Sequence, residues 1–313
     1  AVSAAVHPFS RARPLYRAMT SIDAVADAPK GARPEWVTPE LLPYASNFIE
    51  LDGHTIHYLD EGCGPTLLML HGNPTWSFLY RHLIAALRGR FRCVAMDYPG
   101  FGLSTAAEGY EPLPERHASV VEAFVRAFTP IVQDWGGPIG LSVAGRDPSR
   151  VERLVILNTW AWPVDDDPHF VRFSNIMGGP IGGFVIRHFN AFVNMMIPMG
   201  TPRRKLSSAA MNAYRRPMST AARRRATNVF PRAIVKSTAF LAEVQRGLAA
   251  IADKPALIVW GDKDIAFRAK ERERFESVFA SHTTVLVPGA GHFMQEDAHD
   301  EIASAIDDWW SRP

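Results

Sequence analysis

Short, continuous apolar runs recur along this chain, and segments with helical spacing separate them. The runs are Thr66–Leu70, Cys93–Met96, Leu154–Leu157, Ala256–Trp260 and Thr284–Val287. Strands that are buried on both faces have this pattern, because helices cover both sides of a parallel sheet. The pattern therefore predicts an α/β fold, in which right-handed helical crossovers join a mostly parallel sheet.

Further elements follow from local patterns. Asn47–Leu51 and His54–Leu59 alternate apolar and polar residues around the turn dipeptide Asp52-Gly53, which predicts a hairpin. Ile131–Gln133 predicts one more strand. Helices are predicted over Trp76–Leu87, Pro114–Phe128 and Glu296–Trp310.

Composition excludes several classes of protein. The 313 residues include 34 Lys and Arg against 32 Asp and Glu, so a formal net charge of +2 gives no electrostatic reason to expect nucleic acid. No run approaches the ~18 apolar residues of a membrane span, and we expect no membrane partner. Cys63 and Cys93 have no metal-type spacing, so we expect no metal site and a reducing, cytoplasmic location.

The chain divides into three predicted parts. Residues 1–34 are rich in Ala, Arg and Pro without a continuous apolar segment, so we expect a disordered extension and not a secretory signal; Met19 is an alternative start. Residues 35–159 and 231–313 form the predicted main domain. Residues 160–230 lack a strand signal and contain glycine and proline breakers, which predicts an inserted helical cap over the strand ends.

The cap has an unusual charge distribution. No Asp or Glu occurs from Pro168 to Ala242, whereas basic residues cluster at 203–205, 215–216 and 223–225. Such a surface either attracts anions, a partner or a second copy of the chain, or is a solvated helix face that acids elsewhere balance.

Asp134 lies between the strand signal at Ile131–Gln133 and a pair of glycines. A nucleophile elbow occupies this place in hydrolases of α/β architecture, because small flanking residues permit the tight turn that exposes one side chain. A carboxylate is ionised near neutral pH and can displace a good leaving group from carbon, forming an ester. The alternative is that Asp134 only caps the following helix.

His292 follows the last predicted strand and is the candidate base. Its position after the nucleophile and after an acid matches the order of residues in such hydrolases. Asp262 and Asp264 are both candidates for the acid, and we favour Asp264 because its offset from the strand carries it over the crevice. No carboxylate directly follows the strand Leu154–Leu157, where another acid could stand.

With these residues, the chain resembles the haloalkane dehalogenases of the α/β-hydrolase fold over residues 35–311. The motifs that carry the resemblance are His71–Arg81, Asp97–Ser104, Gln133–Pro138, Trp160–Trp162 and His292–Asp297. The resemblance implies an eight-stranded sheet and the branch of the family with an Asp-His-Asp triad of Asp134, His292 and Asp264.

The resemblance also implies the roles of two further residues. The indole N–H of Trp135 and the side-chain amide of Asn73 would bind the halide, and the backbone N–H groups of the same two residues would form the oxyanion hole. No cofactor or metal is implied. The partners would be a small halogenated aliphatic substrate and a halide product, and the physiological substrate and oligomeric state stay open.

The sequence departs from the family pattern at one place, and several alternative functions have to be considered. The connection Val125–Ile131 is about five residues shorter than the family pattern, and Pro130 lies close to a central strand.

An epoxide hydrolase uses the same nucleophile and base but needs paired cap tyrosines, and Tyr214 is the only tyrosine in the inserted region. A non-catalytic ligand receptor is the alternative from another class. A serine esterase is disfavoured because the elbow carries no serine.

Overall fold

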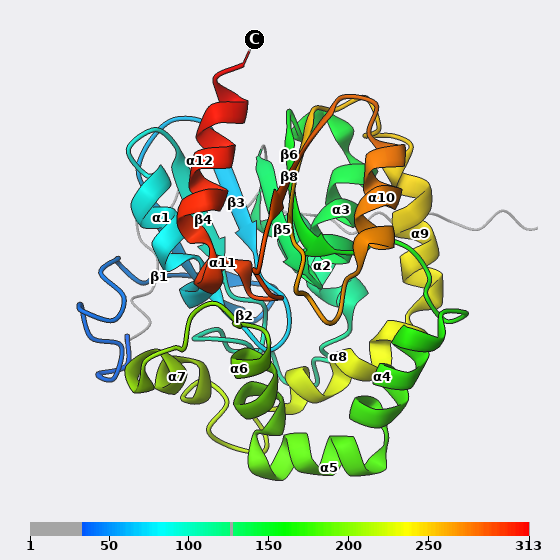
Figure 1. The fold of residues 1–313 in the computed structure, drawn as a ribbon. Helices are drawn as coiled ribbons and strands as arrows, with labels where there is room; N and C mark the ends of the chain where they lie inside the picture. Colours follow the sequence, from blue (N-terminus) through cyan, green and yellow to red (C-terminus); the bar gives the residue numbers. More distant parts are fainter. Residues whose placement is uncertain (1–32, 126–127, 313) are drawn as a thin grey trace, which may run out of the picture.

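A computed structural model describes residues 33–125 and 128–312. Residues 1–32, most of the predicted disordered extension, therefore lie outside the described residues. One mixed sheet organises the rest (Figure 1). Its eight strands are β1 (Asn47–Leu51), β2 (His54–Glu61), β3 (Thr66–Leu70), β4 (Arg92–Met96), β5 (Thr129–Asp134), β6 (Leu154–Thr159), β7 (Ala256–Gly261) and β8 (His282–Val287).

The spatial order of the strands is β1-β2-β4-β3-β5-β6-β7-β8. The pairs β1·β2 and β2·β4 are antiparallel, and all the others are parallel. The predicted α/β fold and mostly parallel eight-stranded sheet are therefore confirmed. Strands β6 and β7 are buried along their whole length, as their apolar runs predict, whereas the edge strand β8 is half exposed.

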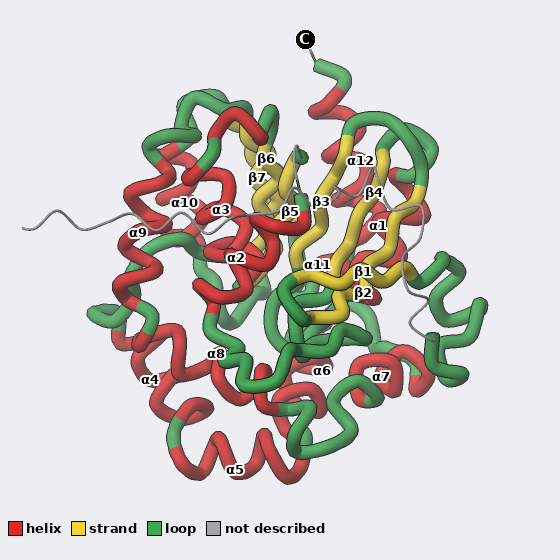
Figure 2. Tube along the Cα trace, turned by 180° about the vertical axis from the view of Figure 1, so that it is seen from behind, coloured by secondary structure: helices red, strands yellow, loops and turns green. Residues whose placement is uncertain are grey.

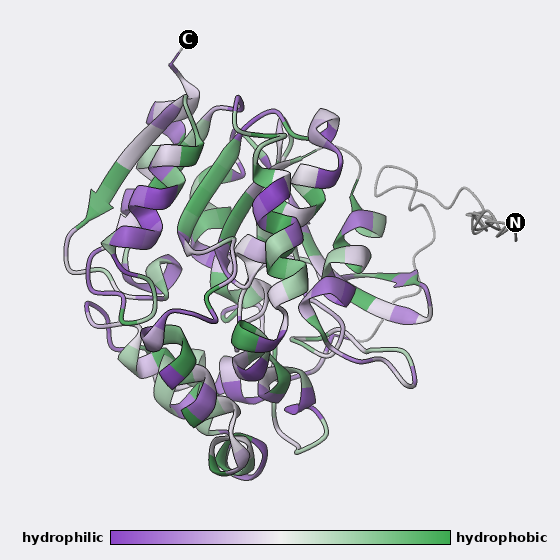
Figure 3. Cartoon of the chain, turned by 90° about the vertical axis from the view of Figure 1, so that its right-hand side faces the viewer, coloured by the Kyte–Doolittle hydropathy of each residue, from purple (hydrophilic) through white to green (hydrophobic). Residues whose placement is uncertain are grey.

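Helices cover both faces of the sheet. One face carries α2 (Pro114–Phe124), α3 (Gly136–Arg146), α9 (Thr238–Leu248) and α10 (Ala269–Val278); the other carries α1 (Arg81–Leu87) and α12 (His299–Trp310). Figures 1 and 2 show these two groups on opposite sides of the strands. In Figure 3 the central strands are mostly hydrophobic and the helices around them carry hydrophilic residues, so the core lies between sheet and helices.

Three predicted helices differ from the structure. The segment predicted as one helix over Trp76–Leu87 is a 3₁₀ turn, η2 (Ser77–Tyr80), followed by α1. The helix predicted over Pro114–Phe128 ends at Phe124, because Phe128 already pairs with Val151 beside the sheet. The helix predicted over Glu296–Trp310 is divided into α11 (Met294–Asp297) and α12, with an extended φ of −148° at Ala298 between them. The carboxylate of Asp297 accepts a hydrogen bond from the Gly291 backbone N–H, which folds α11 back onto the loop before it.

The short connection before β5 leads directly into a central strand. Residues 126 and 127 lie outside the described residues, and β5 begins at Thr129. Pro130 is its second residue and lies opposite Leu68 of the parallel strand β3. The strand then continues to Asp134, with a shift in its register against β6 after Val132, so the shortened connection does not prevent β5 from forming.

Helices fill most of the chain between β6 and α9. They are α4 (Pro168–Gly178), α5 (Pro180–Phe189), the π-helical turn η4 (Phe192–Met196), α6 (Ile197–Met199), α7 (Ser208–Arg215) and α8 (Arg225–Lys236). Figure 1 shows them together at one end of the sheet. The predicted cap boundary at 230/231 falls inside α8, so the exact division into cap and main domain stays a prediction. In the described ranges, no helix has the length and apolarity to cross a bilayer.

Candidate active site

The topology of the sheet opens a crevice between β3 and β5. After β3 the chain continues to β4 on one side, and it then returns to β5 on the other side of β3. Ligands bind at such a reversal in parallel sheets, beyond the carboxyl ends of the strands. Asn73 follows β3 and Asp134 ends β5, so the two residues face this crevice from its two sides.

Asp134 lies on a strained turn. Its φ is +51°, in the left-handed region that L-residues other than glycine rarely adopt. A Cβ atom at Gly136 would lie 2.1 Å from the Leu70 carbonyl oxygen, and one at Gly72 would lie 2.2 Å from Oδ1 of Asp134. The glycines on both sides of the crevice are therefore required for the close approach of β3 to the elbow.

The Asp134 side chain does not cap helix α3. The N-cap residue of α3 is Trp135, and no side-chain hydrogen bond caps that helix. The alternative interpretation of Asp134 as a helix cap is therefore wrong. Instead, Oδ1 of Asp134 accepts a hydrogen bond of 2.7 Å from the backbone N–H of Asn73.

Burial is the main influence on the charge of Asp134. It raises the pKa of this carboxyl above its usual range, although the nearby imidazole of His292 and the backbone N–H groups of Trp135 and Asn73 act in the opposite direction. A carboxylate with few polar neighbours is poorly solvated, which makes its oxygen a better nucleophile than it would be in water.

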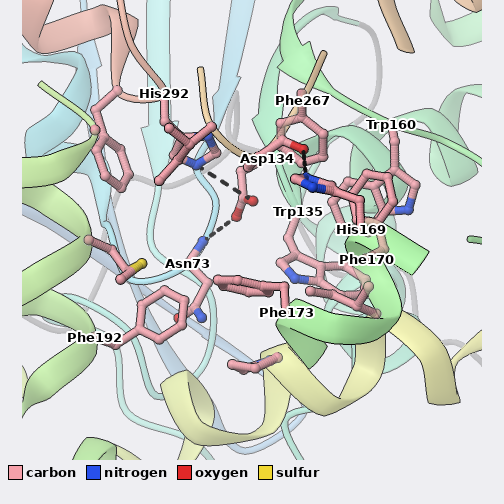
Figure 4. Close-up of a pocket in the computed structure, with 17 residues that line it drawn as sticks. Asn73, Asp134, Trp135, Trp160, His169, Phe170, Phe173, Phe192, Phe267 and His292 are labelled. Carbon is pink, nitrogen blue, oxygen red and sulfur yellow. Dashed lines mark hydrogen bonds and ion pairs between the residues drawn. The ribbon is translucent and has the colours of Figure 1, made fainter. Parts of the chain in front are cut away.

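His292 lies between two carboxylates, of which Figure 4 shows that of Asp134. Its Nδ1 is 3.0 Å from Oδ2 of Asp264, and its Nε2 is 3.7 Å from Oδ2 of Asp134. Burial disfavours the charged ring, but the attraction of Asp264 and Asp134 outweighs it and raises the pKa of His292. Asp262, the other candidate acid, is exposed and accepts a hydrogen bond from the Gly289 backbone N–H, 2.6 Å away.

Gln133 is a site residue to which sequence reasoning gave no role. Its side-chain Nε2 donates to the His292 carbonyl oxygen at 3.1 Å and lies 3.1 Å from Nε2 of the same histidine. The carbonyl only accepts, so it orients the amide with its N–H groups toward the ring. The sequence signal that could have identified Gln133 is a polar glutamine inside a predicted buried strand. A buried amide requires hydrogen-bond partners.

Asn73 and Trp135 face the same cavity. Nδ2 of Asn73 donates to the Thr227 carbonyl oxygen of α8 at 3.3 Å, which leaves its second hydrogen free to bind a ligand. The Trp135 ring packs against Trp160, with ring centroids 4.6 Å apart. Within the described chain, its indole N–H has no hydrogen-bond partner, so it is available as a donor.

The cavity itself is small and apolar, with a volume of about 100 Å³. Aromatic side chains from the main domain and the cap line most of it. They are Trp135, Trp160, Phe170, Phe173, Phe192, Phe267 and Phe293. Its titratable lining residues are Asp134, His292 and His169, and the ring of His169 is 3.0 Å from the Ala266 carbonyl oxygen.

Epoxide hydrolysis needs tyrosine donors, and metal catalysis needs a cluster of ligating side chains. Among the residues that the structure describes, no tyrosine lines the cavity, and the hydroxyl of Tyr214 donates to Oε1 of Glu296 at 2.5 Å. Among the described residues, no group of three or more His, Cys, Asp or Glu side chains is arranged to hold a metal ion.

The fold and the elbow define the class of protein. The model of the α/β-hydrolase fold family matches residues 65–299, so the chain is an α/β hydrolase. It is 44% identical over 275 residues to haloalkane dehalogenase 2 of Mycobacterium tuberculosis and Mycobacterium bovis, an alignment that covers 86% of this chain and 96% of the relative. Within the α/β hydrolases, the chain belongs to the haloalkane dehalogenase family.

Solved structures agree with this assignment. The crystal structure of a DbjA mutant (dbja delta) superposes with a TM-score of 0.77 at 26% identity, covering 85% of this chain and 97% of that one. Haloalkane dehalogenase DatA of Agrobacterium tumefaciens gives a TM-score of 0.76 at 26% identity, with coverage of 86% and 96%. A more distant relative is the cis-3-alkyl-4-alkyloxetan-2-one decarboxylase of Shewanella oneidensis, 32% identical over 85% of this chain and 88% of that protein.

Proposed function

We propose that this protein hydrolyses small haloalkanes to an alcohol, a halide and a proton through an alkyl ester on Asp134. The observation that carries the proposal is a largely buried carboxylate that lines an apolar cavity, with the imidazole of His292 held 3.7 Å away by Asp264. Nucleophile, base and orienting acid thus lie within reach of one another.

In the first step, an oxygen of Asp134 attacks the carbon that carries the halogen from the side opposite to it. The new carbon–oxygen bond forms as the carbon–halogen bond breaks, and the halide leaves with the electron pair. The indole N–H of Trp135 and the amide N–H of Asn73 would stabilise this anion. The aromatic walls exclude water, which strengthens these two hydrogen bonds. Both donors are neutral, so the site can still release the halide.

In the second step, Nε2 of His292 takes a proton from a water molecule, whose oxygen attacks the carboxyl carbon of Asp134. Asp264 stabilises the imidazolium. The backbone N–H of Asn73, already 2.7 Å from Oδ1, and that of Trp135 would bind the oxyanion. The tetrahedral intermediate collapses with loss of the alkoxide, which takes the proton from His292. The regenerated carboxyl group then releases one proton.

The cavity distinguishes this reaction from its nearest alternatives. An epoxide hydrolase must protonate a departing alkoxide, and no tyrosine of the described ranges 33–125 and 128–312 lines this cavity. A cis-3-alkyl-4-alkyloxetan-2-one carries two alkyl chains on a four-membered ring, which a cavity volume of about 100 Å³ fits less well than a haloalkane of a few carbons. A receptor without activity would have no use for a base beside the carboxylate.

Mass spectrometry tests the mechanism. The His292→Phe variant, exposed to 1,2-dibromoethane, should retain a bromoethyl ester on the peptide that contains Asp134, because the hydrolytic step lacks its base. Wild-type protein should release bromide from the same compound and form no diol from styrene oxide. A folded variant with no mass increase on that peptide, or diol formation by the wild type, would refute the proposal.

A further inference from the structure

Helix α5 exposes an apolar stripe at the end of the molecule. The helix forms the lower edge of the cap in both Figure 1 and Figure 2. Gly182, Gly183 and Ile186 face inward, whereas Ile181, Phe184 and Phe189 are 81%, 56% and 64% exposed. The spacing of the exposed residues is that of one helix face, and it points away from the core.

Neighbouring cap segments also expose apolar side chains. The ring of Phe184 is 6.1 Å from that of Phe189, so the two aromatics form one patch. Half-exposed apolar residues stand on the adjoining segments α4, η4 and α6. They are Ile176, Met195 and Met199. We call the six residues the cap stripe: Ile176, Ile181, Phe184, Phe189, Met195 and Met199. An apolar patch of this kind on an otherwise polar surface indicates an interaction site.

Arginines border the cap stripe without carboxylate partners in the described part of the chain. Arg187 is exposed on α5 itself, and Arg224 donates to its carbonyl oxygen at 2.7 Å. Arg215 donates to the Asn194 side chain beside η4, and Arg232 to a carbonyl at the end of α4. Backbone and amide oxygens orient these guanidinium groups but do not neutralise them, so the border of the stripe is strongly cationic.

We propose that the cap stripe and its arginine border dock onto an anionic lipid bilayer. Aromatic and aliphatic side chains on one helix face with cations beside them suit the boundary between acyl chains and anionic head groups. A symmetric contact between two caps would bring the arginines of both copies together, since no Asp or Glu occurs from 168 to 242. Nucleic acid would leave the apolar residues exposed to water.

This inference revises the expectation of no membrane partner, which rested on the lack of an apolar run long enough to span a bilayer. Docking of the cap stripe would also bring the cavity close to the lipid, because α4 and η4 contribute residues both to the stripe and to the lining of the cavity. Phe173 belongs to α4, and Phe192 and Met196 belong to η4. A small apolar compound dissolved in the bilayer would therefore have a short path into the cavity.

Vesicle co-sedimentation tests the inference without any measurement of turnover. The full-length protein is mixed with vesicles of phosphatidylcholine alone, or of phosphatidylcholine with phosphatidylglycerol, at low and at physiological salt. We expect binding to the anionic vesicles only, weakened by salt. Phe184→Ser with Phe189→Ser should reduce the partition coefficient more than tenfold, and Arg187→Ala by about fivefold. Phe184, Phe189 and Arg187 are all exposed, so these substitutions should not affect folding, which circular dichroism can verify.

The matched control is Leu286→Ser, which removes an equally exposed apolar side chain from β8, outside the cap. It should bind vesicles as the wild type does. Failure of the wild type to bind anionic vesicles at low salt would overturn the inference, as would binding that the cap variants leave unchanged. Self-association that the Phe184 and Phe189 variants abolish, without any lipid binding, would show instead that the stripe joins copies of this chain.

Discussion

The side-chain amide of Gln133 donates to the backbone carbonyl of His292 and directs the same Nε2 group at the ring, 3.1 Å from the ring Nε2. An N–H donor aimed at Nε2 favours the tautomer in which that ring atom is an acceptor and the proton is on Nδ1, facing Asp264. This is the protonation state that a general base needs, and the residue directly before the nucleophile favours it.

Removal of this donor should therefore alter the pH dependence of the reaction. The Gln133→Met variant keeps the size of the side chain but loses the N–H that opposes protonation of Nε2. Because Asp264 raises the pKa of His292 above its ordinary value, and His292 acts only after the halide has left, the acid limb appears in kcat, and it should move to higher pH in the variant.

The pH profile of halide release measures this, with a loss of about tenfold at neutral pH. Gln133→Asn, whose amide is one carbon shorter, should fall between wild type and Gln133→Met. An unchanged acid limb in a folded Gln133→Met protein would show that the amide serves packing alone.

Asp264→Asn should block ester hydrolysis. The change removes the charge that stabilises the imidazolium and favours the wrong tautomer, which costs ~10⁴ in turnover in comparable triads. Stopped-flow measurements should show one rapid release of halide per active site and then almost none. Asp262→Asn is the control: that carboxylate binds only the Gly289 backbone N–H and should leave turnover unchanged.

Trp135→Phe should slow formation of the ester. The ring would still pack against Trp160, but the indole N–H that faces the cavity would be lost, at a cost of ~10²–10³ in rate. Bromide affinity, followed by tryptophan fluorescence, should fall in parallel. Trp260→Phe also deletes a buried indole N–H without a partner among the described residues, but outside the cavity, and it should leave both quantities intact.

Glu296→Gln should destabilise the whole fold. Glu296 accepts two hydrogen bonds from Arg81, of 2.6 and 2.8 Å, and a third from the hydroxyl of Tyr214 in the cap. Removing one charge of a buried ion pair leaves the other uncompensated, which costs about 3–5 kcal/mol in the free energy of unfolding. Urea denaturation measures this. Glu122→Gln, which loses only a surface pair with Arg146, should cost less than about 1 kcal/mol.

The sequence by itself determined the sheet and the places of the candidate nucleophile, base and acid. Buried strands need apolar runs, and parallel strands end at one common edge, so polar residues after different runs had to meet there. Asp134 and His292 could be selected in this way although 157 intervening residues separate them. Helix ends were less predictable, because contacts with distant residues help to set them: Phe128 pairs with Val151, and Asp297, just before Ala298, accepts a hydrogen bond from the Arg204 backbone N–H.

Only the tertiary structure decided which polar groups touch. Asp262 and Asp264 are the same residue type, two positions apart, so the sequence does not distinguish them. In the structure Asp262 is exposed, whereas the carboxylate of Asp264 reaches His292. The amide of Gln133, the Tyr214 hydroxyl bound to Glu296 and the outward face of α5 are likewise properties of packing. Local patterns specify which side of an element is apolar, but the partner of a side chain depends on segments brought together by the whole fold.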